Sequence, residues 1–360
     1  MAFHAKRDEN SEQPVTLVES ATMGPTSTTL GGKKMLKFIC APSICLAATL
    51  GLGMPTAAQD YPNRVVTVVV PFAAGGPADS LARVLAAQFS ERLSQRFIVE
   101  NASGAGTTIG TARVARSAPD GYTLLLTNLA ISSNVSLYPK LALNPEKDLA
   151  TVGFINHSAL VLIGRNSLSA NSLSELTDWM RGTRAKVGHT GIGSTAHLSS
   201  TLFAQAIGAE IDHIPYRGGA PGLQDIIAGH LDLFWGAVQA HTEPVNAGLA
   251  KGFGITAKSR FNQLPHVPAL AAEISPKLEI WFWHALFAPA GTPKPVIDKL
   301  NAALQDLLED PKIIQAWADT GVQVYPKDAR TPEAGHALLQ SEIKRWGEVI
   351  RENKIEALQP

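Results

Sequence analysis

Cysteine is almost absent from this chain, and its absence excludes several kinds of chemistry. The 360 residues contain two cysteines, Cys40 and Cys45. Both lie before residue 59, so the rest of the chain has no disulfide, no thiol nucleophile and no cysteine-ligated metal site.

An excess of charge of either sign is also missing. Lys and Arg total 31, Asp and Glu total 31, and the formal net charge is zero. Nucleic acid is therefore not an expected partner, because nucleic-acid-binding proteins carry a basic patch or stripe. Only 17% of the residues are charged, whereas glycine and proline number 30 and 23, which indicates a turn-rich globular protein rather than a disordered one.

The first 58 residues are predicted to be an N-terminal extension and a signal peptide. A lysine-rich stretch at 33–37 precedes an apolar stretch at 38–54, and small residues follow up to Ala58. A basic segment, a short apolar segment and small residues before a polar start are typical of a secretory signal peptide. We expect cleavage after Ala58 and a protein located in the periplasm.

This end of the chain leaves two further questions. A membrane anchor is disfavoured by Pro42 and by the limited apolar length, so the mature chain is not expected to span a membrane. The start of translation stays open, because Met23 and Met35 both precede the apolar stretch.

Short apolar segments alternate with amphipathic segments over the rest of the chain. The β-branched run at 65–72 is typical of a strand buried on both faces, and apolar residues at helical spacing follow it. This alternation predicts an α/β fold with parallel strands and crossover helices. Strands are expected at 65–72, 97–100, 122–127, 152–155, 160–163, 187–190, 212–216, 231–235 and 322–325. Helices are expected after the first strand and at 109–117, 172–181, 195–207, 222–228, 295–307, 313–319 and 332–353.

Three turns between a strand and a helix share one design. They lie at 71–79, 190–197 and 215–222, and each contains paired or closely spaced glycines. Pro77 and Pro221 are each expected at the first position of a helix. Such turns leave backbone N–H groups free at the carboxyl edge of a parallel sheet, where anionic ligands bind. Ordinary tight turns are the alternative for each of them.

Several side chains near these turns are candidates for ligand contacts, each with a structural alternative. Asp79 stabilises its own helix in the alternative interpretation, and His197 caps or packs. Arg217 is a cation suited to an acidic ligand, but such arginines mostly face solvent. Trp235 and the aromatic residues at 281–283 line a cleft or belong to the core.

A glycine-rich turn at Gly104–Gly110 resembles a dinucleotide-binding turn. The alternative function is therefore an NAD- or flavin-dependent oxidoreductase that uses this turn. Its glycine spacing departs from the usual pattern by one residue, and it does not follow the first strand of its unit. No phosphate-binding, zinc-protease or nucleophile-elbow motif is present, and the histidines lack metal-ligand spacing. We therefore predict no catalytic residue, no metal and no cofactor.

Eight short motifs occur in one order along residues 61–355. They are Tyr61-Pro62, Val-Pro-Phe with Gly-Gly and Asp at 70–79, Val-Glu-Asn at 99–101, Ala-Pro-Asp-Gly-Tyr-Thr-Leu at 118–124, Ser-Leu-Tyr-Pro-Lys-Leu at 136–141, Pro-Tyr-Arg-Gly-Gly-Ala-Pro at 215–221, Leu-Pro-His-Val-Pro at 264–268 and Ala-Pro-Ala-Gly-Thr-Pro-Lys-Pro at 288–295. With them the chain resembles the Bug family of extracytoplasmic solute receptors, the TctC-like binding component of tripartite tricarboxylate transporters.

The resemblance implies a periplasmic-binding-protein-like fold of type II, in which two α/β lobes joined by a hinge close over a ligand cleft. Lobe one would comprise 59–160 plus 286–360, and lobe two 161–285. The protein would be a monomer without enzymatic activity. It would capture a small carboxylate for inner-membrane transporter subunits or for a sensor, and the chain alone does not separate these two partners.

The resemblance also assigns ligand contacts to the three turns. These residues are Phe72, Gly76, Ala78, Asp79, Ser194, Thr195, His197, Tyr216, Arg217, Gly218, Gly219 and Ala220. Gly193 in the second turn and Trp235 are further candidate contacts from the residues themselves. Three stretches depart from the family pattern. Pro77-Ala78 replaces a common glycine and threonine, Trp235-Gly236-Ala237 replaces a smaller, more polar stretch, and Trp283-His284 is also unusual. Trp235 therefore motivates the hypothesis of an aromatic or bulkier acid as the ligand.

Overall fold

Ten strands form one sheet in the computed structural model, which describes residues 61–140 and 143–357. The strand order is β2-β1-β3-β9-β4-β7-β5-β6, and β8 and β10 both pair with β4. All described residues belong to one compact unit. The predicted signal peptide and its cleavage after Ala58 lie outside the described residues.

The first three strands along the chain form a group of parallel strands within this sheet. Strand β1 (Val66–Val70) lies between β2 (Phe97–Asn101) and β3 (Thr123–Asn128). Val69 packs in one hydrophobic cluster and Val68 in another, because successive side chains of a strand point to opposite faces. The prediction of a strand buried on both faces is thus confirmed.

A second parallel group has the same arrangement. Strand β5 (Ala185–His189) lies between β6 (Ile211–Pro215) and β7 (Leu233–Ala237). Within each group the carboxyl ends of the parallel strands lie at one edge, which is where the turns singled out in the sequence begin.

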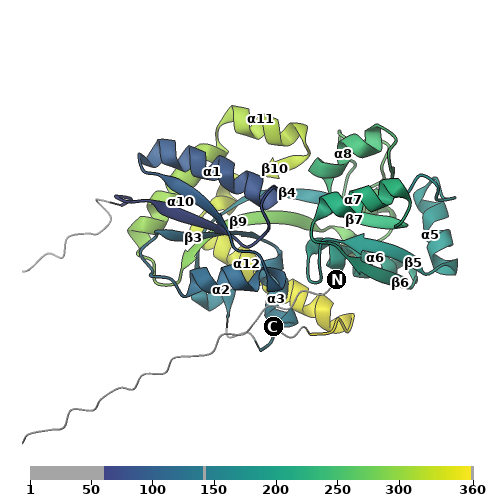
Figure 1. Cartoon of the computed structure of the whole chain (residues 1–360), viewed down its shortest axis with the longest axis horizontal. Coiled ribbons are helices and arrows are strands. Elements are labelled where there is room, and N and C mark those ends of the chain that lie inside the picture. Colours follow the sequence, from purple (N-terminus) through teal and green to yellow (C-terminus); the bar gives the residue numbers. More distant parts are fainter. Residues whose placement is uncertain (1–60, 141–142, 358–360) are drawn as a thin grey trace, which may run out of the picture. The chain divides into compact units, whose positions relative to one another are not determined.

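Two long antiparallel strands connect these groups (Figure 1). Strand β4 (Leu149–Gly164) pairs with β9 (Trp281–Pro289) and β10 (Val322–Val324), and then with β7 and β8 (Lys251–Ile255). Strand β9 also pairs with β3. The chain therefore passes between the two groups inside continuous strands.

The expectation of two separate strands at 152–155 and 160–163 is wrong. The polar residues between them stay in β4 because they pair with neighbouring strands instead of turning. Asn156 lies opposite His284, with 2.9 Å between Asn156 Oδ1 and His284 Nδ1, and Ser158 Oγ donates to the Gly321 carbonyl at 3.1 Å.

Helices cover both faces of the sheet. In the first group α1 (Pro77–Leu93) and α10 (Lys294–Leu308) cover one face, and α2 (Thr108–Ala115), α3 (Ala130–Leu137) and α12 (Pro332–Glu352) cover the other. The remaining helices and helical turns are α4 (Pro145–Asp148), α5 (Leu173–Gly182), α6 (Thr195–Ile207), α7 (Gly219–Ala228), α8 (Val238–Asn246), α9 (Leu270–Glu273), α11 (Pro311–Asp319), η1 (Ala105–Thr107), η2 (Pro276–Leu278) and η3 (Lys327–Arg330). The predicted α/β class is confirmed. Across the part of the chain that the structure describes, no helix is both long and apolar enough to cross a membrane.

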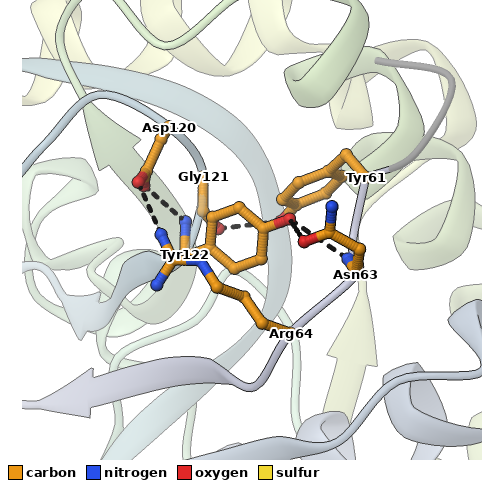
Figure 2. Close-up of polar contacts among 6 residues, drawn as sticks. All are labelled: Tyr61, Asn63, Arg64, Asp120, Gly121 and Tyr122. Carbon is orange, nitrogen blue, oxygen red and sulfur yellow. Dashed lines mark hydrogen bonds and ion pairs between the residues drawn. The ribbon is translucent and has the colours of Figure 1, made fainter. Parts of the chain in front are cut away.

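The start of the described chain is tied to the segment that leads into β3 (Figure 2). Tyr61 Oη donates to the Gly121 carbonyl at 2.8 Å, and Tyr122 Oη donates to Asn63 Oδ1 at 2.9 Å. Arg64 pairs with the carboxylate of Asp120, and its guanidinium carbon lies 3.8 Å from the centre of the Tyr122 ring. Two of the family motifs, at 61–62 and 118–124, are therefore partners in space.

The helix starts confirm one proline prediction and correct the other. Pro77 is the first residue of α1 with Gly76 as N-cap, as expected. Helix α7 begins at Gly219 with Gly218 as N-cap, so Pro221 is its third residue and not its first. Proline is tolerated there because the first four N–H groups of a helix have no intrahelical acceptor.

Gly222 inside α7 allows a test of how closely this helix packs on Phe234 of β7. An ideal Cβ on Gly222 would lie 2.1 Å from the Phe234 ring, so Gly222→Ala requires that fully buried ring to move. We expect it to lower the free energy of unfolding by about 1–3 kcal/mol, which outweighs the roughly 1 kcal/mol by which alanine is favoured over glycine in a helix. Urea unfolding measures the change.

The matched control is Gly182→Ala at the end of α5, where an added Cβ meets nothing within 4 Å. It should be neutral or slightly stabilising. Equal effects of the two substitutions would contradict the packing of α7 on Phe234.

Candidate functional site

Asp79 holds the turn between β1 and α1. Its carboxylate accepts hydrogen bonds from the Gly75 amide (2.9 Å), from Arg83 Nε (2.9 Å) and from Asn101 Nδ2 (3.0 Å). The bond from Arg83 is the main reason why the pKa of Asp79 falls to about 2, and burial opposes it. The residue is 3% exposed and both oxygens are engaged, so Asp79 stabilises its own helix and turn.

The rest of this turn presents backbone rather than polar side chains. Gly76 caps α1 without any side-chain hydrogen bond, and Pro77 has no N–H to donate. The amides of Ala78 and Asp79 are therefore the free donors at this helix start. The Phe72 side chain packs against a core cluster, and its carbonyl accepts from Asn101 Nδ2 at 3.1 Å.

The turn between β5 and α6 is built by its own polar groups. Ser194 Oγ accepts from the His197 amide at 3.2 Å, and His197 Nδ1 accepts from the Gly193 amide at 3.2 Å. The Gly193 carbonyl accepts from Ser133 Oγ of α3 at 2.8 Å. Gly193 has φ 79°, and a Cβ there would lie 2.4 Å from Leu137, so glycine is required. This turn therefore connects the second parallel group to α3 of the first.

Buried polar groups without hydrogen-bond partners follow on one side of α6. Thr195 Oγ1 and Ser199 Oγ are one helical turn apart, and both lack a partner among the described residues. Phe203, one turn further, packs edge-on against the Trp235 ring with 5.8 Å between centroids, and Trp235 Nε1 is also unpartnered. Each such group costs about 1–3 kcal/mol if nothing satisfies it.

A second set of such groups lies at the end of β3 and in α3. The unpartnered atoms, again among the described residues, are Thr127 Oγ1, Ser132 Oγ and Asn134 Oδ1. Asn134 Oδ1 is 3.6 Å from the Cβ position of Gly193, which places this set beside the α6 turn. Sequence reasoning missed it because α3 was not predicted. The signal was present, since Asn128 ends a buried strand and Ser132, Ser133 and Asn134 follow shortly after it.

The third turn is more exposed. Tyr216 Oη donates to Asp225 Oδ2 at 2.7 Å, and burial together with this bond raises the pKa of Tyr216 to about 12. The Tyr216 amide donates to the carbonyl of His189, which ties this turn to the end of β5. Arg217 and Ala220 are exposed, and Gly218 and Gly219 are half-buried.

Trp235 packs in the core of this structure. The residue is 0% exposed and lies in β7 opposite Leu162 of β4, within a core cluster. Trp283 is likewise buried, and its Nε1 donates to Glu342 at 3.0 Å. An alternating strand places every second side chain in the core, and both tryptophans occupy such positions.

The Gly104–Gly110 turn has a packing explanation. A Cβ on Gly106 would lie 2.7 Å from the Tyr138 hydroxyl, and one on Gly110 would lie 2.8 Å from the Ala102 carbonyl and 2.9 Å from Pro71. The glycines are therefore required by the chain's own side chains and backbone, and nothing about them supports the oxidoreductase alternative.

The histidines, which seemed scattered along the sequence, are partly gathered in space. His189, His197 and His213 each place a ring nitrogen within 4.8 Å of the others. Sequence spacing did not reveal this cluster because its members lie on two strands and a helix.

Asp79 generates a pH-dependent prediction. Its folded pKa of about 2 is below the ordinary value of 3.8, so its contribution to stability is complete above that value and is lost as the pH falls from 3.8 toward 2. We expect the gap in the free energy of unfolding between the wild type and Asp79→Asn to shrink over this window. Urea unfolding at several pH values measures it, with Asp306→Asn on the exposed side of α10 as the matched control. A gap that is the same at about pH 6 and about pH 2.5 contradicts the prediction.

Comparisons with known proteins show the family and the fold of this chain. Residues 81–355 match the tripartite tricarboxylate transporter family receptor, TctC. The solved periplasmic binding protein BugD shares 34% sequence identity with a TM-score of 0.76, over 83% of this chain and 100% of BugD.

Two similar structures contain ligands. MatC from Rhodopseudomonas palustris, solved with malate, is 34% identical with a TM-score of 0.75 over 81% of this chain and 100% of MatC. Rpa4515 from R. palustris, solved with adipate, is 31% identical with a TM-score of 0.76 over 83% of this chain and 100% of that protein. These similarities confirm the predicted periplasmic-binding-protein fold. The chain belongs to the TctC family of solute-binding receptors of tripartite tricarboxylate transporters.

Proposed function

We propose that this receptor is exported to the periplasm and binds an aliphatic dicarboxylate as a monomer, without chemical turnover. The bound acid would be handed to inner-membrane transporter subunits, and a sensor is the alternative recipient with the same binding chemistry. Malate and adipate, the ligands of MatC and Rpa4515, are both aliphatic dicarboxylates, which supports this ligand class.

The observation that carries the proposal is a set of buried hydroxyls without partners among the described residues, in the two segments that the Ser133–Gly193 hydrogen bond joins. A dicarboxylate brings only acceptor oxygens when ionised, so it needs hydroxyl and amide donors. Thr195 and Ser199 of α6 supply hydroxyls, as do Thr127 and Ser132 from the β3–α3 segment. The ligand would thus satisfy groups that the fold itself leaves without partners.

Helix starts supply the remaining attraction for the anion. The free amides of Ala78 and Asp79 at α1 and those at the start of α6 point toward an anion with the favourable end of each helix dipole. One such end contributes roughly 0.3–1 kcal/mol, or about 2 kcal/mol when partly buried, so two ends and four hydroxyls hold a dicarboxylate without an arginine.

The proposed contacts keep most of the residues predicted from the sequence, but change what some of them do. Asp79 acts through its backbone amide, because its side chain is engaged within its turn. Ser194 positions the start of α6, because its amide donates to the Gly191 carbonyl at 3.2 Å and its hydroxyl accepts from the His197 amide. Trp235 is not among the proposed contacts, because its ring packs within a core cluster. An aliphatic acid is proposed in place of an aromatic one because of the ligands of MatC and Rpa4515. The other proposed contacts are Phe72, Gly76, Ala78, Gly193, Thr195, His197, Tyr216, Arg217, Gly218, Gly219 and Ala220.

Lobe one (59–160 plus 286–360) and lobe two (161–285) would each contain one parallel group. Both boundaries fall inside the strands that connect the groups, β4 and β9, which supports a hinge there. Export is tested by N-terminal sequencing of the protein recovered from the periplasm, with Gln59 as the expected first residue. A chain recovered there with residues 1–58 still attached contradicts the cleavage.

The ligand class is tested by thermal and urea unfolding of residues 59–360 with a panel of dicarboxylates, aromatic acids, amino acids and nucleotides. A ligand at 100 times its dissociation constant stabilises the folded state by about 2.7 kcal/mol. We expect this shift with at least one aliphatic dicarboxylate. A shift with nucleotides alone overturns the proposal.

Two variants on α6 serve as site and control. Thr195→Val removes an unpartnered hydroxyl at constant shape, so it should weaken the best ligand about 10-fold without lowering ligand-free stability. Ser200→Ala removes a buried hydroxyl that donates to the His197 carbonyl at 2.7 Å, so it should cost stability but leave affinity unchanged. The reverse pattern would place the ligand elsewhere.

A further inference from the structure

Three histidines that are distant in sequence meet beside the start of α6. His189 is the last residue of β5, His197 lies in the first turn of α6, and His213 is the central residue of β6. The ring of His197 lies 4.7 Å from each of the other two rings, measured between centroids. His189 is 0% and His197 is 6% exposed, whereas His213 is exposed.

Each ring is held through one nitrogen. His189 Nδ1 accepts from the Gly191 amide at 3.2 Å, and His197 Nδ1 accepts from the Gly193 amide at 3.2 Å. His213 Nδ1 lies 3.2 Å from Ser200 Oγ. The second nitrogen of His189, Nε2, is buried and has no partner among the described residues, so the cluster contains a fully buried polar atom that the fold leaves unsatisfied.

The hydrogen bonds of the cluster favour a cation over an anion. Nδ1 of His189 and Nδ1 of His197 each accept from an amide, so each of these rings has a nitrogen without a proton. Such a nitrogen carries the lone pair that binds a metal, and a neutral imidazole offers little attraction to an anion.

We propose that His189, His197 and His213 form a site for a transition-metal dication such as Zn²⁺, with three imidazole ligands and a fourth position open. Zinc held by three histidines is a common arrangement, with bonds of about 2.0–2.1 Å that place ligand nitrogens about 3.4 Å apart. The nitrogens here lie within 4.8 Å of one another, so modest rotation of the rings brings them to that spacing.

The outside of the cluster opens toward solvent. His213 lines a surface hollow together with Thr201, Gln205 and Arg184, which gives an ion a route to the rings. Arg184 Nε pairs with Asp212 Oδ1 at 2.7 Å, so its charge is offset by a carboxylate.

Metal binding would change the turn that the proposed function uses. A metal on Nδ1 of His189 or His197 displaces a glycine amide, and a metal on Nε2 moves the ring proton to Nδ1, which then no longer accepts. Either way the amides of Gly191 and Gly193 are released. Both glycines have positive φ, 115° and 79°. Because glycine has no Cβ, the backbone at these two positions can change conformation without a clash of its own side chain. The metal site itself does not depend on the proposed ligand.

The test is a titration of tag-free, metal-free residues 59–360 with Co²⁺ in the absence of any organic acid. We expect one equivalent to bind with the visible absorption of a four-coordinate cobalt ion, and Zn²⁺ to displace it. His213→Ala, at an exposed position, and His189→Ala should each weaken binding at least about 100-fold, since loss of even an outer-shell partner costs 10–100-fold. The matched control His266→Ala, at an exposed loop position outside the cluster, should bind as the wild type does.

Several outcomes overturn the metal site. These are the absence of stoichiometric Co²⁺ binding, an octahedral spectrum that does not respond to His213→Ala, or an equal loss in His266→Ala. Because no organic acid is present, failure here leaves the dicarboxylate proposal standing, and failure of the ligand panel leaves the metal titration interpretable.

Discussion

The antiparallel pairing of β4 with β9 is the constraint on which the rest of the structure depends. Strand β4 gives its first half to one set of partners and its second half to another, and β9 connects it to β3. Asn156 and Ser158 remain in the strand because their polar side chains find partners across it. Without this pairing the two parallel groups would have no common framework, and their turns would not be held beside each other.

The turns at the carboxyl edges divide their polar groups between two tasks. Asp79, Ser194 and Tyr216 have side chains suited to ligand binding, yet each is engaged by its own turn or helix. These bonds fix the backbone, so the amides at the helix starts point in defined directions. The buried side chains without partners among the described residues include Thr195 and Ser199. A ligand would therefore meet a rigid set of donors, which reduces the ordering cost of binding.

The histidine cluster and the donor set share the β5–α6 turn but differ in electrostatics. The buried imidazoles are uncharged because ionisation without a counter-charge is unfavourable there. Two glycine amides that could donate hydrogen bonds to an anion donate instead to the rings of His189 and His197. The protonation and ligation of His197 are thus linked to Gly193, whose amide donates to the His197 ring and whose carbonyl accepts from the Ser133 hydroxyl.

Local pattern alone determined a good part of this protein. The β-branched run of β1, the N-cap at Gly76 and the glycine-rich turns follow from spacing and backbone preference, so the α/β class and the place of the turns were predictable. The tertiary structure alone decided which polar groups are used and which are left over. Ser133 meets Gly193 and His189 meets His213 only because strand order brings distant segments together. Trp235 lies in the core for the same reason, because its burial depends on what covers β7, and local sequence does not encode that.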